Sequence, residues 1–185
     1  MVMSQVLEVV NASTESVDTA ARLRSLSTDQ LLDRFKEGTA PDTLRVLDGD
    51  QRGLGLTLTV FTKTRFHSWL GRYAATPGFL WNGKSFRSKS DTEGWGWNRF
   101  AKGPILTIFP FKTLLGASII DGNTSVIIDY NVKRNPWWER RSWDELREVD
   151  PGVFLGFTAI RMFGRYPKVV WFAVDTTRGN VWHAV

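Results

Sequence analysis

Hydrophobic and polar residues alternate along much of the chain, a pattern that predicts a protein built mainly of β-strands. In the clearest stretch, 53–62, four apolar residues alternate with glycines and threonines, which is typical of a strand with one buried face. Further candidate strands follow at short spacing: 79–81, 84–88, 95–100, 104–109, 111–120, 125–130, 144–149, 153–160, 168–175 and 180–185. We therefore expect a single antiparallel up-and-down β-barrel of about 8–10 strands, because closure removes exposed strand edges.

Two short helices are predicted in the N-terminal half. Ser27 and Gln30 form a capping box, an apolar stripe follows, and Gly38 stands at the C-cap position, so a helix is expected over 28–37. Such a helix commonly plugs one open end of a barrel. Apolar residues with helical spacing predict a second helix over 63–75.

The segment 143–160 predicts a hairpin that organises the barrel. Asp150-Pro151-Gly152 is a turn sequence, and the arm 153–160 is apolar at nearly every position, so both of its faces should be covered. The other arm places Glu145 and Arg147 on one face and Asp144 on the opposite face. Charges on both faces of such a strand indicate that some point into an enclosed space, which we interpret as a ligand pocket.

Length and composition limit the possible classes of protein. With 185 residues we expect one barrel domain over 27–185, preceded by a partly disordered extension over 1–26. Nine Trp and twelve Phe are enough to fill a wide core or line a cavity. The absence of cysteine excludes disulfides and thiolate sites, and two histidines cannot form a multi-histidine metal site, so no metal or cofactor is expected.

Sequence motifs and charge give only general guidance on activity and location. The chain has no phosphate-binding loop, dinucleotide fingerprint or Gly-x-Ser-x-Gly elbow. It shows neither a signal peptide nor eighteen consecutive apolar residues, so we expect a cytoplasmic protein without a transmembrane segment. The net charge of +5 favours anionic partners.

Several polar residues are surrounded by aromatic ones and are candidates for binding a ligand. Lys84 and Asn98 lie near Trp81 and Trp97, which could supply apolar contacts while the polar groups orient the ligand. The glycines beside Trp97 could instead mark a bulge that only bends the strand.

Carboxylates near the hairpin are candidates for acid or base chemistry. If 125–130 pairs with 144–149, Asp129 or Tyr130 could face Arg147 or Glu145 inside the barrel. A buried carboxylate or tyrosine there could transfer a proton to or from a substrate. The alternative is a set of exposed cross-strand salt bridges.

The loop 133–141 mixes cations with Trp137 and Trp138. This combination can bind single-stranded nucleic acid through phosphate contacts and base stacking. A lid over the pocket, or peripheral contact with a membrane surface, accounts for the same residues.

These features together resemble the calycin group, the lipocalin and fatty-acid-binding-like barrels. The resemblance rests on a short helix ahead of the barrel, Trp81-x-Gly83-Lys84-x-Phe86, the Asp121-Gly122 hairpin and the hairpin beginning Pro151-Gly152. The chain is also similar to bacterial proteins with a comparable Asp-Glu-Leu-Arg-Glu segment followed by Pro-Gly. The resemblance implies binding of a small apolar molecule inside the barrel.

The expected function is binding of a small hydrophobic or amphipathic molecule, such as a lipid, terpenoid or polyketide. The candidate ligand contacts are Trp81, Lys84, Trp97, Asn98, Asp129, Tyr130 and Arg147. The alternative is a cofactor-independent cyclase or isomerase, which would shape its substrate in the cavity. Its candidate catalytic residues are Asp129, Tyr130 and Glu145. Binding of single-stranded nucleic acid is a lesser alternative, and no specific nucleic-acid partner is expected.

Overall fold

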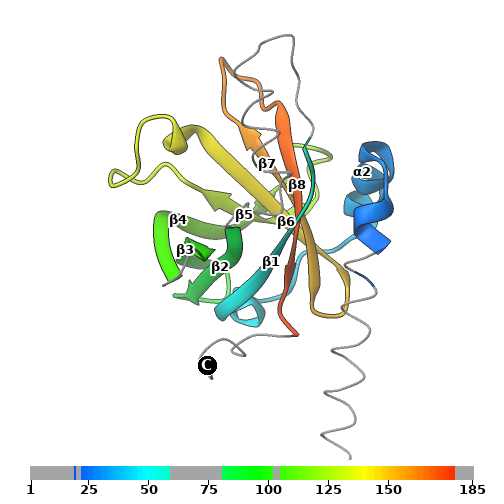
Figure 1. Ribbon diagram of the computed structural model, residues 1–185, viewed down its shortest axis with the longest axis horizontal. Helices are drawn as coiled ribbons and strands as arrows, with labels where there is room; N and C mark the ends of the chain where they lie inside the picture. The colour runs from blue at the N-terminus through cyan, green and yellow to red at the C-terminus, as the bar shows by residue number, and fades with distance from the viewer. Residues whose placement is uncertain (1–18, 20–21, 59–80, 102–104, 178–185) are drawn as a thin grey trace, which may run out of the picture.

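The protein folds as a closed barrel of eight antiparallel strands (Figure 1). The computed structural model describes residues 19, 22–58, 81–101 and 105–177. Each strand pairs with its neighbours in sequence, and β8 closes the barrel against β1. The strands are β1 (Gly49–Leu58), β2 (Trp81–Ser88), β3 (Glu93–Ala101), β4 (Ile105–Ala117), β5 (Thr124–Asp129), β6 (Ser142–Asp150), β7 (Val153–Ile160) and β8 (Lys168–Asp175). The predicted up-and-down barrel is therefore confirmed, whereas the helix expected over 63–75 and the strand over 180–185 lie outside the described residues.

Two predicted strand boundaries are wrong. Asn82-Gly83 is not a hairpin turn, because β2 runs through it. A Cβ on Gly83, whose φ is +128°, would lie 2.0 Å from the Gln51 carbonyl oxygen, so the glycine allows β1 to approach. The segments 104–109 and 111–120 form one strand, β4, whose register against β3 shifts between Trp97 and Asn98.

One hydrophobic core lies in the barrel interior. It combines residues from opposite sides of the barrel with Leu44 and Leu47 of the 3-10 helix η1 (Leu44–Leu47); the strand residues are Phe86, Phe111, Val126, Ile128, Leu146, Phe154, Phe172 and Val174, with Tyr130 just after β5. The side-chain amide of Gln51 donates to the carbonyls of Leu47 and Asp48, at 3.0 and 2.8 Å, which fastens η1 to β1. Thus η1 closes the end of the barrel at which β1 begins.

A second core lies on the outer wall, beneath helix α2 (Thr28–Glu37). The predicted capping box is present at Ser27, and the buried face of the helix packs on β7 and β8. The Phe35 ring centroid lies 5.2 Å from that of Phe157 and 6.1 Å from that of Trp171. The expectation that this helix plugs the barrel is therefore wrong: it lies beside the barrel, because its apolar face matches an apolar outer wall (Figure 1).

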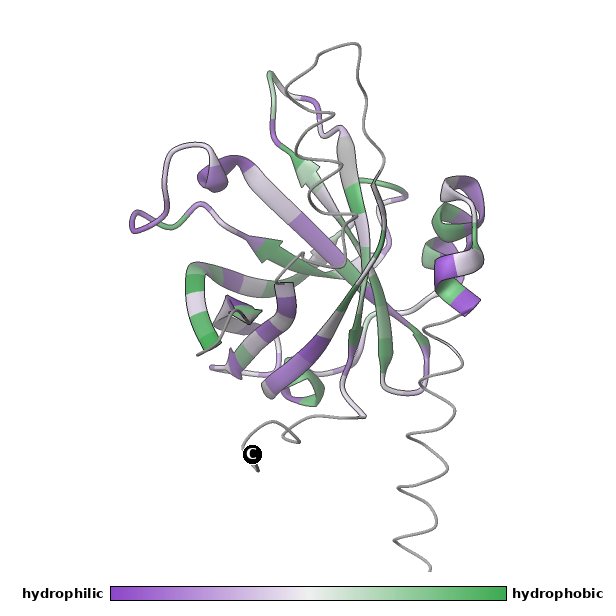
Figure 2. Cartoon of the chain, viewed as in Figure 1, coloured by the Kyte–Doolittle hydropathy of each residue, from purple (hydrophilic) through white to green (hydrophobic). Residues whose placement is uncertain are grey.

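Burial on both faces of β7 follows from these two cores. Val153, Leu155 and Phe157 face α2, whereas Phe154 faces the interior. On β4, where no described helix covers the outer wall, Phe111 and Thr113 are buried and Lys112 and Leu114 are exposed, and Figure 2 shows hydrophobic and hydrophilic bands along the strand. The predicted coverage of both faces of 153–160 is confirmed.

We predict that Phe35→Ala lowers the free energy of unfolding by about 3–5 kcal/mol, because it leaves a cavity between α2 and the outer wall. Denaturant unfolding provides the measurement. Val46→Ala is the control, because Val46 is 48% exposed and should change the stability by less than about 0.5 kcal/mol. Equal effects of the two substitutions would contradict the packing role of α2.

Candidate functional site

Lys84 lies at the centre of a polar cluster inside the barrel. It shares the inner face of β2 with Phe86, and its side chain is 3% exposed. Its ammonium group donates to Asn98 Oδ1 at 2.9 Å, Tyr130 OH at 2.5 Å and Asp144 Oδ2 at 2.8 Å. All three ammonium hydrogens therefore have acceptors, as a buried cation requires.

Further hydrogen bonds connect these groups into one network. Trp81 Nε1 donates to Asn98 Oδ1 at 3.1 Å, and Asn98 Nδ2 donates to Tyr130 OH at 3.0 Å. Tyr130 OH donates to Asp144 Oδ2 at 3.0 Å. We call these five residues the central cluster: Trp81, Lys84, Asn98, Tyr130 and Asp144.

One carboxylate oxygen of the central cluster, Oδ1 of Asp144, lacks a hydrogen-bond donor among the described residues. Asp144 is 1% exposed, and its buried Oδ1 atom has no hydrogen-bond partner within the described ranges of the chain, although Oδ2 accepts two hydrogen bonds. A buried carboxylate oxygen normally has a partner, since an unmet one costs free energy. The arrangement therefore presents an unused acceptor inside the barrel.

Aromatic rings surround the ammonium group. Its nitrogen lies 5.1–5.5 Å from the ring centroids of Trp81, Phe111, Tyr130 and Phe172, within the range of cation–π attraction. Burial, followed by the negative charge of Asp144, raises the pKa of Tyr130 well above its usual range. At neutral pH the phenol is therefore protonated and remains a donor.

Glu139 adds an acidic group beside this cluster. It begins the 3-10 helix η2 (Glu139–Arg141). Burial, and then repulsion from the Asp144 carboxylate, raise the pKa of Glu139 to about 7, and the attraction of Lys84 only partly opposes them. Glu139 is thus a carboxyl group that can exchange a proton near neutral pH.

The structure brings together four of the predicted site residues, Trp81, Lys84, Asn98 and Tyr130, but adds two that the sequence analysis did not select, Asp144 and Glu139. Asp144 could have been found from its strand, because it shares a face with Leu146, just as Lys84 shares one with Phe86. A charged residue two positions from an inward-facing core residue of the same strand also faces inward, and this pattern would have identified Asp144.

Trp97 and Asp129 do not point into the barrel, contrary to expectation. Trp97 is on the outer face and packs edge-on against Trp95, with ring centroids 4.4 Å apart. Asp129 lies at the end of β5 beside Arg161, with 3.5 Å between Oδ1 and NH2. The alternation of β5 turns the buried Ile128 and Tyr130 inward, so Asp129 faces outward.

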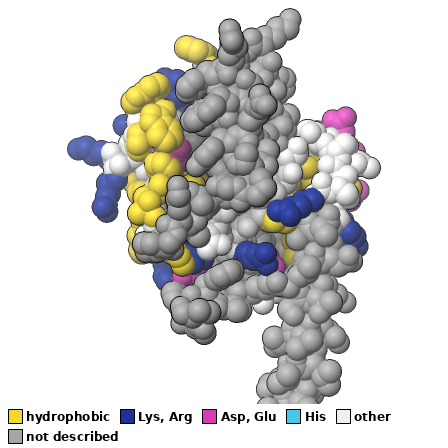
Figure 3. Space-filling model, viewed as in Figure 1, with side chains coloured by type: hydrophobic (Ala, Val, Ile, Leu, Met, Phe, Trp, Pro, Cys, Tyr) yellow, Lys and Arg dark blue, Asp and Glu magenta, His cyan; other side chains and the backbone are white. Residues whose placement is uncertain are grey.

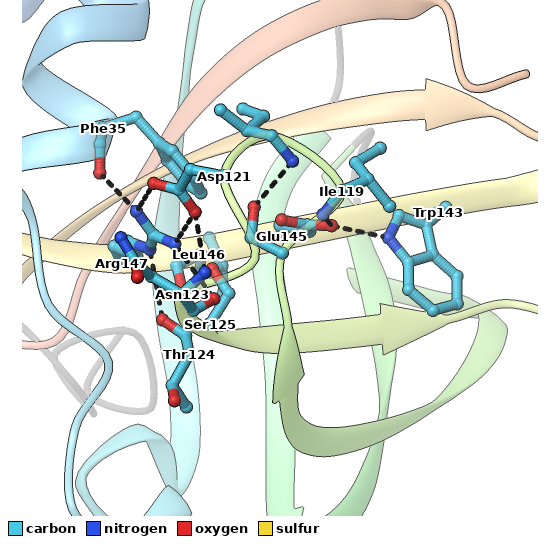
Figure 4. Close-up of polar contacts among 12 residues, drawn as sticks. Phe35, Ile119, Asp121, Asn123, Thr124, Ser125, Trp143, Glu145, Leu146 and Arg147 are labelled. Carbon is cyan, nitrogen blue, oxygen red and sulfur yellow. Dashed lines mark hydrogen bonds and ion pairs between the residues drawn. The ribbon is translucent and has the colours of Figure 1, made fainter.

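Arg147 and Glu145 also belong to the outer wall (Figure 4). The Arg147 guanidinium forms a bidentate pair with Asp121, at 2.8 and 2.6 Å, and lies 4.7 Å from the Phe35 ring centroid. Glu145 Oε1 accepts from the Ile119 backbone N–H at 2.9 Å and from Trp143 Nε1 at 3.0 Å. The expectation that these residues face Tyr130 inside the barrel is wrong, because they hold the β4–β5 turn and α2 against β6.

Comparisons with known proteins support the fold and leave the activity open. No protein-family model and no curated protein sequence matches the chain. A crystal structure of a protein from Thermomonospora curvata is similar, with a TM-score of 0.53 and 16% identity over 89% of this chain and 97% of that one. At this identity the similarity concerns the barrel alone.

Two features are absent from the part of the chain that the structure describes. There, no group of three or more His, Cys, Asp and Glu residues is arranged to hold a metal ion. In the same part of the chain, no helix is both long and apolar enough to span a membrane.

We predict that Asp144→Leu destabilises the protein by about 3–5 kcal/mol, because it leaves the Lys84 charge buried without its partner. Replacing both partners, as Lys84→Met with Asp144→Leu, should restore most of the loss, since two apolar side chains need no pairing. Denaturant unfolding of the two variants measures this. A double variant as unstable as Asp144→Leu alone would show that the unpaired Lys84 charge does not cause the loss of stability.

We also predict a pH effect from Glu139. Its pKa is about 7 in the folded protein and 4.5 as the ordinary value, so the folded state binds the proton more tightly. The resulting stabilisation is fully present below pH 4.5 and is lost as the pH rises through 7. Glu139→Gln should remove a decline on the order of 2 kcal/mol between pH 5 and 8. The exposed Glu93, changed to Gln, is the control, and a decline unchanged in Glu139→Gln would contradict the assignment.

Proposed function

We propose that this protein binds a small apolar or amphipathic molecule, such as a lipid, terpenoid or polyketide, with the polar group of the ligand at the central cluster. The observation that carries the proposal is the buried Asp144 Oδ1 atom without a partner. A hydroxyl or N–H group of a ligand would supply the missing hydrogen bond. The resemblance to calycin barrels implies the same class of ligand.

The energetics of the cluster support a role beyond holding the barrel together. A buried ion pair contributes little net stability compared with apolar side chains of similar size. Here the pair of Lys84 and Asp144 lies in a core that is otherwise largely apolar. Buried polar groups that converge among aromatic side chains are typical of small-molecule sites.

The direction of access also supports the proposal. Leu44 and Leu47 close the end of the barrel at which β1 begins. Lys84, Asn98 and Asp144 lie on the half of their strands nearer the opposite end. We therefore propose that a ligand enters from this opposite end, where the β5–β6 and β7–β8 loops are the connections that the structure describes.

The charges of the site favour a neutral ligand head group. The Lys84 ammonium is already satisfied by three acceptors, and the two acidic groups, Asp144 and Glu139, lie in or beside the cluster. A carboxylate would meet repulsion without gaining a free donor. We therefore propose apolar alcohols, amides or aromatic amines, which are neutral at pH 7, over fatty acids.

A cofactor-independent cyclase or isomerase is the second candidate function. One observation favours it: Glu139, with a pKa of about 7, lies close enough to Asp144 for their charges to interact. An acid of this strength, together with the Tyr130 hydroxyl, could move a proton within a bound substrate. Of the three catalytic candidates taken from the sequence, Asp129, Tyr130 and Glu145, only Tyr130 takes part in this arrangement.

The binding proposal is tested with 1-aminoanthracene, a neutral fluorescent amine. We expect its fluorescence to rise on binding, and decan-1-ol to displace it roughly fivefold to tenfold more effectively than decanoate or decane, because one buried hydrogen bond is worth about 1–1.5 kcal/mol. Asp129→Asn, on the outer face, is the matched control. Lys84→Met with Asp144→Leu should abolish the preference for the alcohol.

Absence of probe binding, or a preference for the alcohol that persists in the double variant, would overturn the proposal. Native mass spectrometry of freshly purified protein, followed by denaturing extraction, would identify a molecule that copurifies. Conversion of that molecule by fresh protein would support the enzyme instead of the carrier.

A further inference from the structure

The loop between β7 and β8 contains a residue that neither packing nor backbone preference explains. Met162 and Arg165 exchange backbone hydrogen bonds of 2.9 and 2.8 Å around the turn pair Phe163-Gly164. Both central residues have positive φ, +48° and +74°, a conformation in which Asn-Gly is preferred. Phe163 is disfavoured there, and its side chain is 98% exposed, so no burial compensates.

The neighbouring β5–β6 loop exposes further apolar side chains at the same end of the barrel. Trp137 is 70% and Trp138 is 49% exposed, and a 2.7 Å hydrogen bond from Arg161 N to Arg141 O joins the two loops. In an up-and-down barrel these two connections lie at one end. At this end we define a loop-end surface by its exposed apolar residues: Ile105, Leu106, Trp137, Trp138, Met162 and Phe163.

Positive charge accompanies this surface. The segments 130–141 and 161–167 contain six cations, Lys133, Arg134, Arg140, Arg141, Arg161 and Arg165, but only one carboxylate, Glu139. Of these cations Arg161 is paired with Asp129, the residue that precedes the first segment. The balance of the two segments, +5, equals the net charge of the whole chain, so the remainder is neutral. In Figure 3, hydrophobic side chains gather on one side of the molecule, with Lys and Arg side chains next to them.

We infer that the loop-end surface docks on an anionic lipid bilayer, with Phe163 and the two tryptophans entering the head-group region and the cations facing the phosphates. Aromatic residues at protruding tips, with Lys and Arg behind them, match the chemistry of that interface. Single-stranded nucleic acid fits less well, because Ile105, Leu106 and Met162 offer no ring for base stacking.

Vesicle cosedimentation tests this inference. Wild-type protein should bind vesicles of 70% phosphatidylcholine and 30% phosphatidylserine, bind pure phosphatidylcholine more weakly, and lose affinity for the anionic vesicles as salt increases. Phe163→Asn should reduce binding roughly tenfold, because it removes one inserted aromatic side chain. The same substitution should keep or raise the melting temperature, since Asn-Gly suits the turn. If Phe163 had only a structural role, the substitution would not weaken vesicle binding while keeping or raising the melting temperature.

Val46→Asn is the matched control, because Val46 is an exposed apolar residue of η1, at the closed end, and should leave binding unchanged. Phe163→Gly, which also tolerates positive φ, repeats the test if the Asn variant folds poorly. Failure of wild-type protein to bind anionic vesicles, or undiminished binding by the Phe163 variants, would overturn the inference. So would binding of a single-stranded oligonucleotide without vesicle binding. These outcomes do not depend on the 1-aminoanthracene measurement.

Discussion

The ion pair between Lys84 and Asp144 is the constraint around which the barrel interior is arranged, because neither charge can stay buried without the other. Because the eight strands follow one another around the closed barrel, β2 and β6 lie on opposite walls, and the 2.8 Å contact between Nζ and Oδ2 joins them across the interior. Asn98 from β3 and Tyr130 after β5 complete the crossing. In a closed sheet the backbone hydrogen bonds join each strand only to its two neighbours, so a polar link across the diameter adds a further constraint on the cross-section. A buried charge pair tolerates little displacement, because each partner would lose the opposite charge that offsets its desolvation.

Three glycines let the aromatic rings approach the walls around this pair. A Cβ on Gly53 would lie 2.5 Å from the Trp81 ring, one on Gly96 would lie 2.7 Å from Phe111, and one on Gly156 would lie 2.9 Å from Phe172. Added methyl groups would push the rings toward Lys84, whose nitrogen is already within cation–π distance of all three. Gly94 and Gly96 pair in regular register with both neighbouring strands, and the shift against β4 lies just beyond them, between Trp97 and Asn98. Gly96 therefore does not mark the bulge; its missing side chain leaves room for the Phe111 ring.

The sequence was sufficient for the barrel but not for the orientation of every strand. The alternation of side chains along a strand correctly placed Asp144 on one face of β6 and Glu145 and Arg147 on the other. It does not reveal which of the two faces is turned toward the barrel interior. Both faces of β6 are buried, one by the interior core and the other by α2 and the β4–β5 turn, so burial alone does not distinguish them. The apolar arm 153–160 had the same ambiguity. Asn82-Gly83 misled for a different reason: glycine serves tight turns and close strand approaches equally well, and only the position of Gln51 reveals which applies.

The two ends of the barrel differ in whether their turn residues suit the backbone conformation. At the closed end, the turns at Gly122 and Gly152 place glycine at positive φ, and the apolar residues Leu44 and Leu47 are buried. At the other end, Phe163 takes positive φ, and large apolar side chains remain in water. Among the described turns, the one at Phe163-Gly164 breaks this preference, and its exposed ring gains no burial that would offset the strain. Residues that do not suit their local backbone or solvent environment are usually found at functional sites, and the rest of the fold offsets the stability that they cost. The unmet oxygen of Asp144 and the excess of cations lie toward the same end, which is therefore where binding is expected.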